Sequence, residues 1–564
     1  MATIMSCCAS TFPVMMIRCS AESRSSSPPR IGLPKSSTST NYSSSAAASA
    51  SASAHHKISS TVDILPRTIK ETWVKLLDDF VDGVFEFVDQ PYLPSQSNFA
   101  PVDEIGEPVH ATVVHGSIPH DFPEGVYIRN DHRLILALVQ DLTPVWSDGR
   151  WMISYNNRHV ETDTFKHEKD RKKPGFLPAI EGDSPAVLLA YVLNWLRFGS
   201  VNKYLSNTSV FEHSGKFYSA AENHIPQEID ILTLETRQNW DINGDWTRPF
   251  TSHPKKAPGT GELVIMGIYP QKPYFELGIV SADGKKLVHK VDLKLSRCCL
   301  CHEIGITRRL IKYNKKGYAR IGIMPRYGDA DSVHWFEVEP SCTFHIINCY
   351  EEDDEVIVLA CRARNSIIPG PDFGWNKFEW FSKGFKQIGA LEEIDEESED
   401  DSFLSRVYEW RLNMLSGDVA EKNLTGAEYS MDFPIINEKC IGKKNKFGYT
   451  QVVNSDASSI SGMAKYGGLA KIFLEERELE ELIKVEYHKF PGNTFCSGPA
   501  FVAKSGGVEE DDGWIITYVH NEDSDVSQVY IVDAKNFSHE PVAKITLPRR
   551  VPYGFHGAFM PLHP

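Results

Sequence analysis

The chain of 564 residues is 41% hydrophobic and 24% charged, which is the balance of a soluble globular protein with a large core. Its net charge of −16 argues against binding to a nucleic-acid backbone. The eleven cysteines are scattered without regular spacing, which argues against a disulfide framework. A chain of this length could hold several domains, but all-β barrels and propellers also reach it as one unit.

Residues 1–60 differ in composition from the rest of the chain. They contain eighteen serines, five basic residues and a single acid, Glu22. Serine-rich, acid-poor leaders are typical of organelle transit peptides, and the small number of arginines favours the chloroplast over the mitochondrion. The segment therefore predicts a disordered plastid transit peptide, and a disordered tail without a targeting role is the alternative. The fold should begin near Thr61.

Two segments predict helices. In residues 68–88, within a helical segment expected over 61–100, apolar residues recur at helical spacing, as in Trp73, Leu77 and Phe80. A second helix is expected over 184–199, with Ser184 as its cap and Pro185 in its first turn. This second helix is too short to cross a bilayer, which takes about 20 apolar residues. Both helices could bury an apolar face in a membrane surface or pack against the protein body.

Most of the remaining chain, residues 101–564, is strand-like. Short β-branched or aromatic segments such as ELVIMGIYP and GWIITYVH alternate with Gly, Pro, Asn and Asp, and several hairpins look alike. Loose repetition of this kind suits an all-β propeller, although no WD-type signature is present. The run LEEIDEESEDDS at 391–402 carries eight carboxylates and predicts a solvated loop.

Histidines at strand ends or inside strands are the candidate metal ligands. His345 lies between Phe344 and Ile346 in a run that should be buried, and a buried imidazole needs a hydrogen-bond partner or a metal. His556 lies in VPYGFHGAFM between two glycines, which by itself is more typical of a turn. The cluster CCLCH at 298–302 lacks the second ligand pair of a structural zinc site. Spacing alone cannot select ligands among twenty histidines.

From about Pro101 onward the sequence resembles the carotenoid cleavage oxygenase family. The resemblance is carried by GSIPHDFPEGVYIRN, TSHPKKAPGTGEL, CHEIGIT, MPRYGDADSVHWFEVEPSCTFHIINCYEE, MDFPIIN, EEDDGWIITYVHNE and VPYGFHGAFMP. It implies a seven-bladed β-propeller with a helical cap and a non-haem Fe(II) held by four histidines. Matched position by position, these ligands are His253, His302, His345 and His556.

The resemblance also implies the chemistry. Four neutral imidazoles suit Fe(II) and leave two positions for dioxygen and substrate. Carboxylates should orient the rings through their other N–H, and the matching positions are Glu222 and Asp432, the latter in place of a glutamate. Gly498 stands where a third acid is expected, so one imidazole should lack its carboxylate. The implied reaction is cleavage of a conjugated double bond of a carotenoid or apocarotenoid by O2, giving two carbonyl products.

Further expectations concern location and completeness. The stretch 168–199 and the HPKKAPGTGEL context look most like the plant zaxinone-synthase-like subgroup, which acts on apocarotenoids. The serine-rich leader and a carotenoid-type substrate together place the protein in the plastid, in the stroma or at the membrane surface. The segments after Asn130 and after His302 are shorter than the family pattern, and His302 and His345 are 43 residues apart. An incomplete blade is therefore expected. The alternative function is a catalytically impaired propeller that binds apocarotenoids. A zinc-dependent hydrolase is the third and least favoured hypothesis, because no carboxylate motif accompanies the histidines.

Overall fold

The computed structural model describes two compact units built from different parts of the chain. The described residues are 14–17, 67–88, 98–111, 113–130, 134–140, 152–177, 184–296, 301–306, 309–315, 319–364, 382, 384–385, 404–475 and 482–562. The smaller unit contains the described residues between 14 and 88 and between 173 and 203. The larger unit contains those from 98 to 172 and from 204 to 562. The acidic run 391–402 and Cys298 lie outside the described residues.

The smaller unit is formed by two helices and a two-stranded sheet. Its elements are β1 (Val14–Ile17), α2 (Arg67–Val84), β2 (Phe85–Val88) and α4 (Ser184–Phe198). The helix expected over 68–88 ends at Val84. The next four residues, FEFV, contain aromatic and β-branched side chains that favour a strand, and they pair with β1. β1 is the described part of the expected leader.

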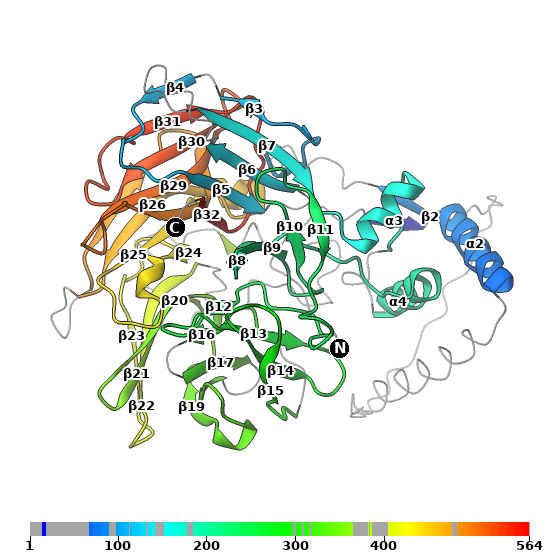
Figure 1. The fold of residues 1–564 in the computed structure, drawn as a ribbon, viewed down its shortest axis with the longest axis horizontal. Coiled ribbons are helices and arrows are strands. Elements are labelled where there is room, and N and C mark those ends of the chain that lie inside the picture. Colours follow the sequence, from blue (N-terminus) through cyan, green and yellow to red (C-terminus); the bar gives the residue numbers. More distant parts are fainter. Residues whose placement is uncertain are drawn as a thin grey trace, which may run out of the picture. The chain divides into compact units, whose positions relative to one another are not determined.

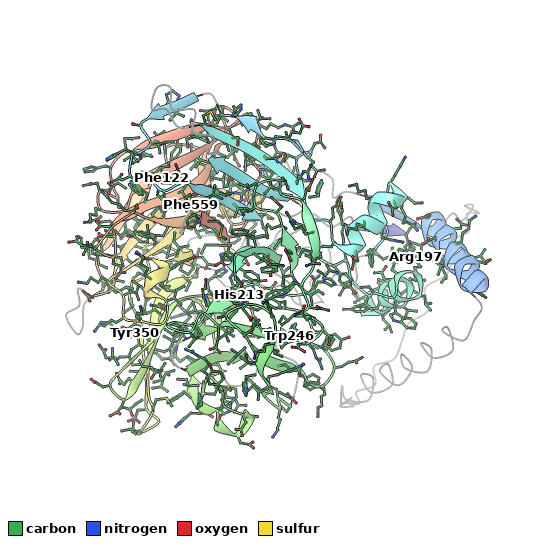
Figure 2. All side chains as sticks on the ribbon, in the orientation of Figure 1. Phe122, Arg197, His213, Trp246, Tyr350 and Phe559 are labelled. Atoms are coloured by element: carbon green, nitrogen blue, oxygen red, sulfur yellow. The ribbon has the colours of Figure 1, made fainter. Side chains whose placement is uncertain are left out.

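The two helices share a small core. Val81, Phe85, Leu177, Ala190 and Leu193 are buried together. Next to this core, the buried Arg197 guanidinium (Figure 2) forms an ion pair of 2.6 Å with Asp78 of α2. The amphipathic pattern of each helix therefore buries one face inside this unit.

The larger unit is mostly β-structure, and its first four sheets have four strands each. The first contains β8 (Ser209–His213), β9 (Lys216–Ala220), β10 (Gln227–Ile229) and β11 (Thr236–Asn239). The second contains β12 (Lys255–Lys256), β13 (Leu263–Ile268), β14 (Phe275–Val280) and β15 (Leu287–Asp292). The third contains β16 (Gly305–Ile306), β17 (Arg309–Lys315), β18 (Ala319–Pro325) and β19 (His334–Val338). The fourth contains β20 (Cys342–Glu352), β21 (Glu355–Ala363), β22 (Arg406–Asn413) and β23 (Val419–Asn423).

Two larger sheets complete the unit. The nine-stranded sheet contains β24 (Met431–Ile435), β25 (Phe447–Val453), β26 (Tyr466–Phe473), β27 (Val485–Lys489), β28 (Thr494–Ala503), β29 (Gly513–Asn521), β30 (Val526–Asp533), β31 (Ala543–Thr546) and β4 (Val113–Gly116). The five-stranded sheet contains β3 (Val109–His110), β7 (Ile153–His159), β6 (Leu134–Gln140), β5 (Gly125–Asn130) and β32 (Gly557–Pro561). β32 pairs with β5, so this sheet joins the first strands of the unit to the last one.

The sheets follow one another around the larger unit in chain order (Figure 1). Their strands are antiparallel, and the short helices α3 (Asp163–Arg171) and α6 (Ser455–Ser461) lie in the connections. The core lies between consecutive sheets, where Ile321 of β18 packs in one buried cluster with Val358 of β21. Leu359 of β21 and Ile472 of β26 share the next cluster. Inner strands such as β13 and β14 are buried along their whole length, which explains their continuous apolar runs, whereas outer strands such as β11 and β15 are partly exposed.

The expectation of an incomplete blade after His302 is wrong for the described strands. β16–β19 form a sheet of four strands, and β17 and β18 pair over seven residues from Arg309↔Pro325 to Lys315↔Ala319. A hairpin with short connections needs few residues, so the shorter segment still supplies the whole sheet. The region after Asn130 likewise contributes β6 and β7 to the five-stranded sheet.

Candidate metal centre

The four predicted histidines lie on, or directly before, strands at the edges of four sheets. His345 is in β20, and β20 is the edge strand of its sheet. His253 comes two residues before β12, His302 three residues before β16, and His556 one residue before β32. Each of these strands is also the edge of its sheet. An edge strand has no neighbour on one side, so residues on or next to it can approach other sheets. Four distant parts of the chain can therefore meet here.

The four imidazoles converge on one point. Their ligand nitrogens all lie within 4.8 Å of one another. His253 Nε2 lies 3.0 Å from His302 Nε2, and His556 Nε2 lies 3.1 Å from His345 Nε2. The side chain of His302 is 11% exposed and that of His345 is 7% exposed. The structure therefore brings together all four residues that the motifs selected.

Two of the rings are oriented by carboxylates. His302 Nδ1 lies 2.5 Å from a Glu222 oxygen, and His345 Nδ1 lies 2.7 Å from Asp432 Oδ1. Glu222 follows β9 and Asp432 lies in β24, so each carboxylate comes from a sheet that does not carry its histidine. Burial opposes ionisation of Glu222, but the charge and hydrogen bond of His302 outweigh it and lower the pKa of Glu222. The pKa of His302 is correspondingly raised, because Glu222 outweighs the effect of burial on the ring.

The other two rings are kept neutral. Burial, followed by the neighbouring imidazoles, holds the pKa of His253 and the pKa of His556 well below the ordinary value. Within the described residues, neither ring forms an ion pair with a carboxylate. Gly498, which stands where a third acid was expected, has no side chain to supply one.

The donor set fits a divalent transition metal. A carboxylate that accepts the Nδ1 proton leaves the Nε2 lone pair of His302, and likewise of His345, directed at the cluster. Lone pairs about 3 Å apart repel one another unless a proton or a cation lies between them, and neutral imidazole is the form that binds a metal. Four imidazole nitrogens suit iron, copper, nickel or zinc by ligand type. The residues alone do not choose iron over the other metals.

At Gly498, where the resemblance led us to expect a third acid, an arginine fills the space that a side chain would need. A Cβ on Gly498 would lie 2.3 Å from Arg129 Cδ, and the backbone there has φ of +66°. The fully buried Arg129 guanidinium donates to Ser497 Oγ and to the Pro552 carbonyl and lies over the Tyr518 ring. Arg129 therefore bridges β5, β28 and the segment leading to His556.

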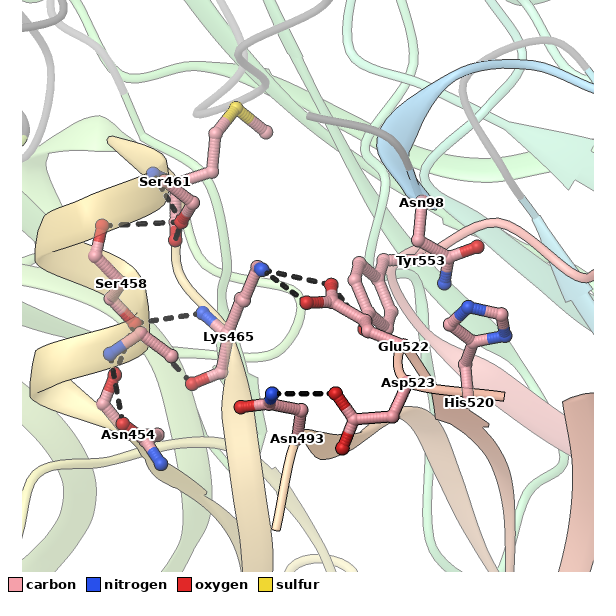
Figure 3. Close-up of polar contacts among 12 residues, drawn as sticks. Asn98, Asn454, Ser458, Ser461, Lys465, Asn493, His520, Glu522, Asp523 and Tyr553 are labelled. Atoms are coloured by element: carbon pink, nitrogen blue, oxygen red, sulfur yellow. Dashed lines mark hydrogen bonds and ion pairs between the residues drawn. The ribbon is translucent and has the colours of Figure 1, made fainter. Parts of the chain in front are cut away.

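The segment before His556 is held from several sides. Tyr553 Oη donates to Glu522 at 3.0 Å, and Glu522 pairs with the buried Lys465 ammonium at 2.8 Å (Figure 3). The Tyr553 N–H also donates to the Asn98 carbonyl. Together with Arg129, these contacts fix the approach of the chain to His556.

The glycines around His556 permit close backbone packing, as expected from their missing side chains. A Cβ on Gly557 would lie 1.9 Å from the Gly498 carbonyl oxygen, and one on Gly554 would lie 2.5 Å from the Asn130 carbonyl oxygen. Real Cβ atoms do not approach so closely, so larger residues at these positions would displace the strand that follows His556. The glycines serve the position of His556 rather than an isolated turn.

Three further residues at the site were not selected from the sequence. The Phe433 ring lies 4.7 Å from His345 and 4.8 Å from His556 between ring centroids, and its φ of +53° is uncommon for a residue with a side chain. Lys255 and Glu303 contact each other beside the histidines. Both belong to the quoted motifs TSHPK and CHE, where the histidines alone were chosen, and no sequence signal marks the backbone angle of Phe433.

A cavity of about 230 Å³ reaches the histidines. Its lining includes His253, His345 and His556, and its charged groups are Lys255, Glu303 and Glu438. Sites for drug-sized ligands usually measure about 300–1,000 Å³ and are mostly apolar. The described cavity is smaller than this range, and apolar side chains such as Phe211, Phe501 and Phe559 also line it.

The fold is shared with known oxygenases. The chain superimposes on cobalt-substituted Synechocystis ACO with a TM-score of 0.66 at 17% identity, covering 83% of this chain and 98% of that chain. It matches lignostilbene dioxygenase from Pseudomonas brassicacearum with a TM-score of 0.66 at 20% identity, covering 84% and 99%. At these identities the likeness concerns the fold: a mostly β protein of the type found in these two oxygenases.

The sequence comparisons give the family. The model described as retinal pigment epithelial membrane protein (RPE65) matches residues 99–311 and 308–561. Carotenoid 9,10(9',10')-cleavage dioxygenase 1 of Arabidopsis thaliana is 30% identical over 550 residues, covering 89% of this chain and 96% of that protein. The chloroplastic 9-cis-epoxycarotenoid dioxygenase NCED1 of Oryza sativa is 28% identical, covering 88% and 80%. The chain belongs to the RPE65/carotenoid cleavage dioxygenase family, as the motif resemblance predicted.

Proposed function

We propose that the protein is a non-haem Fe(II) dioxygenase that cleaves a conjugated double bond of a carotenoid or apocarotenoid. The observation that carries the proposal is the convergence of His253, His302, His345 and His556 in a chain that belongs to this family. The names of the relatives support a carotenoid-type substrate. Iron is the metal of choice because the reaction needs a redox-active centre that accepts dioxygen, whereas zinc has no redox chemistry.

The chain's own residues would act by holding the metal and shaping its surroundings. The four neutral imidazoles add no negative charge to the cation, while Glu222 and Asp432 keep two rings in the tautomer that binds it. Bound iron would supply the one-electron chemistry that lets dioxygen react with a double bond. The balanced reaction adds both oxygen atoms of O2 across one C=C bond and yields two carbonyl products. It needs no side-chain nucleophile or general base.

We also propose that the sheets are the blades of a seven-bladed propeller. The four four-stranded sheets would be four blades, and the five-stranded sheet with β32 and β5 a fifth. The nine-stranded sheet would supply two more, because β26 and β28 are connected by a single residue pair, Tyr466↔Cys496. The strands β24–β27 and β28–β31 then form separate blades, and the edge strands that carry the histidines would line the axis.

The proposed function is tested by oxygen uptake on purified protein. After loading with Fe(II), addition of an apocarotenoid should cause consumption of one O2 per cleaved double bond, with two carbonyl products found by mass spectrometry. A protein that binds the apocarotenoid but consumes no oxygen would instead be the catalytically impaired binder. This second function is supported by the arginine that fills the space at Gly498, the position where the resemblance implies a third acid.

A lipid-facing surface on the smaller unit is proposed as the route to an apolar substrate. Trp73, Leu76 and Phe80 of α2 are 51–59% exposed, and Leu188 and Leu189 of α4 are 56% and 46% exposed. Among the described helices none has the length and apolar character to cross a bilayer. Helices with such exposed apolar side chains can lie in the membrane interface.

Replacing Leu188 and Leu189 with serine is expected to release the protein from liposomes. Each leucine loses roughly 1.5–3 kcal/mol of burial in lipid, so binding should fall by at least tenfold in a flotation assay. The matched control replaces Leu415 and Val508, which are 79% and 94% exposed in the larger unit, and should bind as the wild type does. Equal flotation of all three proteins would exclude this surface.

Residues 1–60 are proposed to direct the protein to the plastid. The serine-rich, acid-poor composition supports this, and some relatives are named chloroplastic. A fluorescent fusion of residues 1–70 should enter chloroplasts and lose about 54 residues on import, as judged from its mass. A fusion that stays in the cytosol at full length would show that the segment is not a transit peptide.

A further inference from the structure

An ion pair lies directly beside the histidines and has no role in the chemistry described above. The Lys255 ammonium contacts Glu303 Oε1, and the two side chains are 22% and 5% exposed. The other carboxylate oxygen, Glu303 Oε2, accepts the backbone N–H of Ile346 at 2.6 Å. Both oxygens of one buried carboxylate are therefore used, one by a side chain and one by the backbone.

Each of the three partners lies within two residues of a different histidine in the sequence. Lys255 follows His253 by two residues, Glu303 follows His302 directly, and Ile346 follows His345 directly. The three segments lie on or directly before β12, β16 and β20, which are edge strands of three different sheets. One carboxylate thus connects three of the four chain segments that carry the candidate ligands.

The Ile346 N–H is available because of its place in β20. β20 is an edge strand, so N–H groups on its open side have no ladder partner. Its pairing with β21 also shifts in register on both sides, between Thr343 and His345 and between Ile346 and Asn348. Such bulges re-aim side chains, and a buried N–H that loses its acceptor is destabilising. Glu303 supplies that acceptor next to His345.

We infer that Lys255 and Glu303 are positioning residues that set the spacing of His253, His302 and His345 for metal binding. The pair is not part of the four-histidine cluster itself. It acts through the three backbone segments that it ties together. The inference rests on the proposed metal-binding function of the histidines and adds to it the contact that holds their relative positions.

The expected effect is a loss of metal affinity without loss of the ligands themselves. Removing a residue that supports metal ligands costs roughly 10- to 100-fold in affinity. Lys255→Met removes one of the two links, and Glu303→Gln removes the charge that pairs with Lys255 while keeping an oxygen for Ile346. Glu303→Ala removes both links and should have the largest effect.

The test is titration of the metal-free protein with Co(II), followed by its visible absorption, together with melting temperature. The single variants should bind Co(II) about 10- to 100-fold more weakly, with an altered absorption spectrum. The matched control is Lys471→Met, which breaks another buried pair, with Asp511, in which the side chains are 3% and 11% exposed. It should lower the melting temperature but leave the Co(II) affinity unchanged.

A charge-swapped protein, Lys255→Glu with Glu303→Lys, separates positioning from simple ion pairing. It restores opposite charges, but lysine cannot accept the Ile346 N–H, so the Co(II) affinity should stay low. Recovery of wild-type affinity in this variant would overturn the positioning role, as would unchanged affinity in Lys255→Met and Glu303→Ala. Failure of the wild-type protein to bind Co(II) or Fe(II) would instead overturn the proposed metal centre itself.

Discussion

Replacing His345 with alanine is expected to abolish metal binding and cleavage. The imidazole is nearly buried, its Nε2 faces the other three rings, and its Nδ1 is paired with Asp432. Removing it deletes a proposed ligand and leaves the Asp432 carboxylate without its ring partner. The loss of metal affinity should exceed the roughly 10- to 100-fold that follows removal of a supporting carboxylate. Iron content after anaerobic loading and oxygen uptake measure the two effects.

The control for this variant is another buried histidine. His213 is fully buried and its Nε2 lies 2.9 Å from the Ser281 carbonyl oxygen, outside the histidine cluster (labelled in Figure 2). His213→Ala should lower stability but keep one metal per chain. If His345→Ala retained the wild-type metal content and activity, the four-histidine site would not be the catalytic centre.

Replacing Gly557 with alanine is expected to destabilise the larger unit strongly. The new Cβ would lie 1.9 Å from the Gly498 carbonyl oxygen, which belongs to the backbone of β28 and cannot rotate away. Either β32 or β28 must move, and overpacking that shifts the backbone typically costs roughly 1–3 kcal/mol and occasionally more. Because Gly557 follows His556, the movement should also displace that ring and weaken metal binding.

Gly83 provides the contrasting substitution. It lies in α2 with no atom within 4 Å of the position of a new Cβ. Gly83→Ala should stabilise the helix by up to about 1 kcal/mol, because alanine is the better helix former. Denaturant unfolding gives the free energy of unfolding of each variant, and the metal content is measured in a separate experiment. A Gly557→Ala protein as stable as the wild type would mean that β28 and β32 are not packed as described.

The four histidines and two supporting carboxylates could be chosen from the sequence, but the link between Glu303 and Ile346 could not. Motifs that surround each histidine are short and local, so His253, His302, His345 and His556 could be matched one by one. Glu222 came from the stretch SAAENHIPQEID and Asp432 from the motif MDFPIIN, and the structure places both against candidate ligand rings. The link from Glu303 to Ile346 depends on an open strand edge and on bulges in β20, which no local pattern shows.

The sequence predicts the fold class, a mostly β protein with a few helices, but not how these elements group into units. The β-rich character and the two helices follow from side-chain periodicity, and the helix expected over 184–199 is α4. The grouping of α2 with α4 in a separate unit depends on contacts such as Arg197 with Asp78, 119 residues apart. The completeness of the sheet β16–β19 was misjudged because missing length was taken as missing strands, whereas short hairpin connections preserve them.

The central claim is that four histidines from four sheets hold one iron ion. The most direct measurement is anomalous X-ray scattering across the iron absorption edge from crystals of the Fe(II)-loaded protein. A four-histidine iron site predicts one peak per chain, enclosed by the Nε2 atoms of His253, His302, His345 and His556. A peak bound elsewhere, or its absence at this position in protein that consumes oxygen with an apocarotenoid, would contradict it.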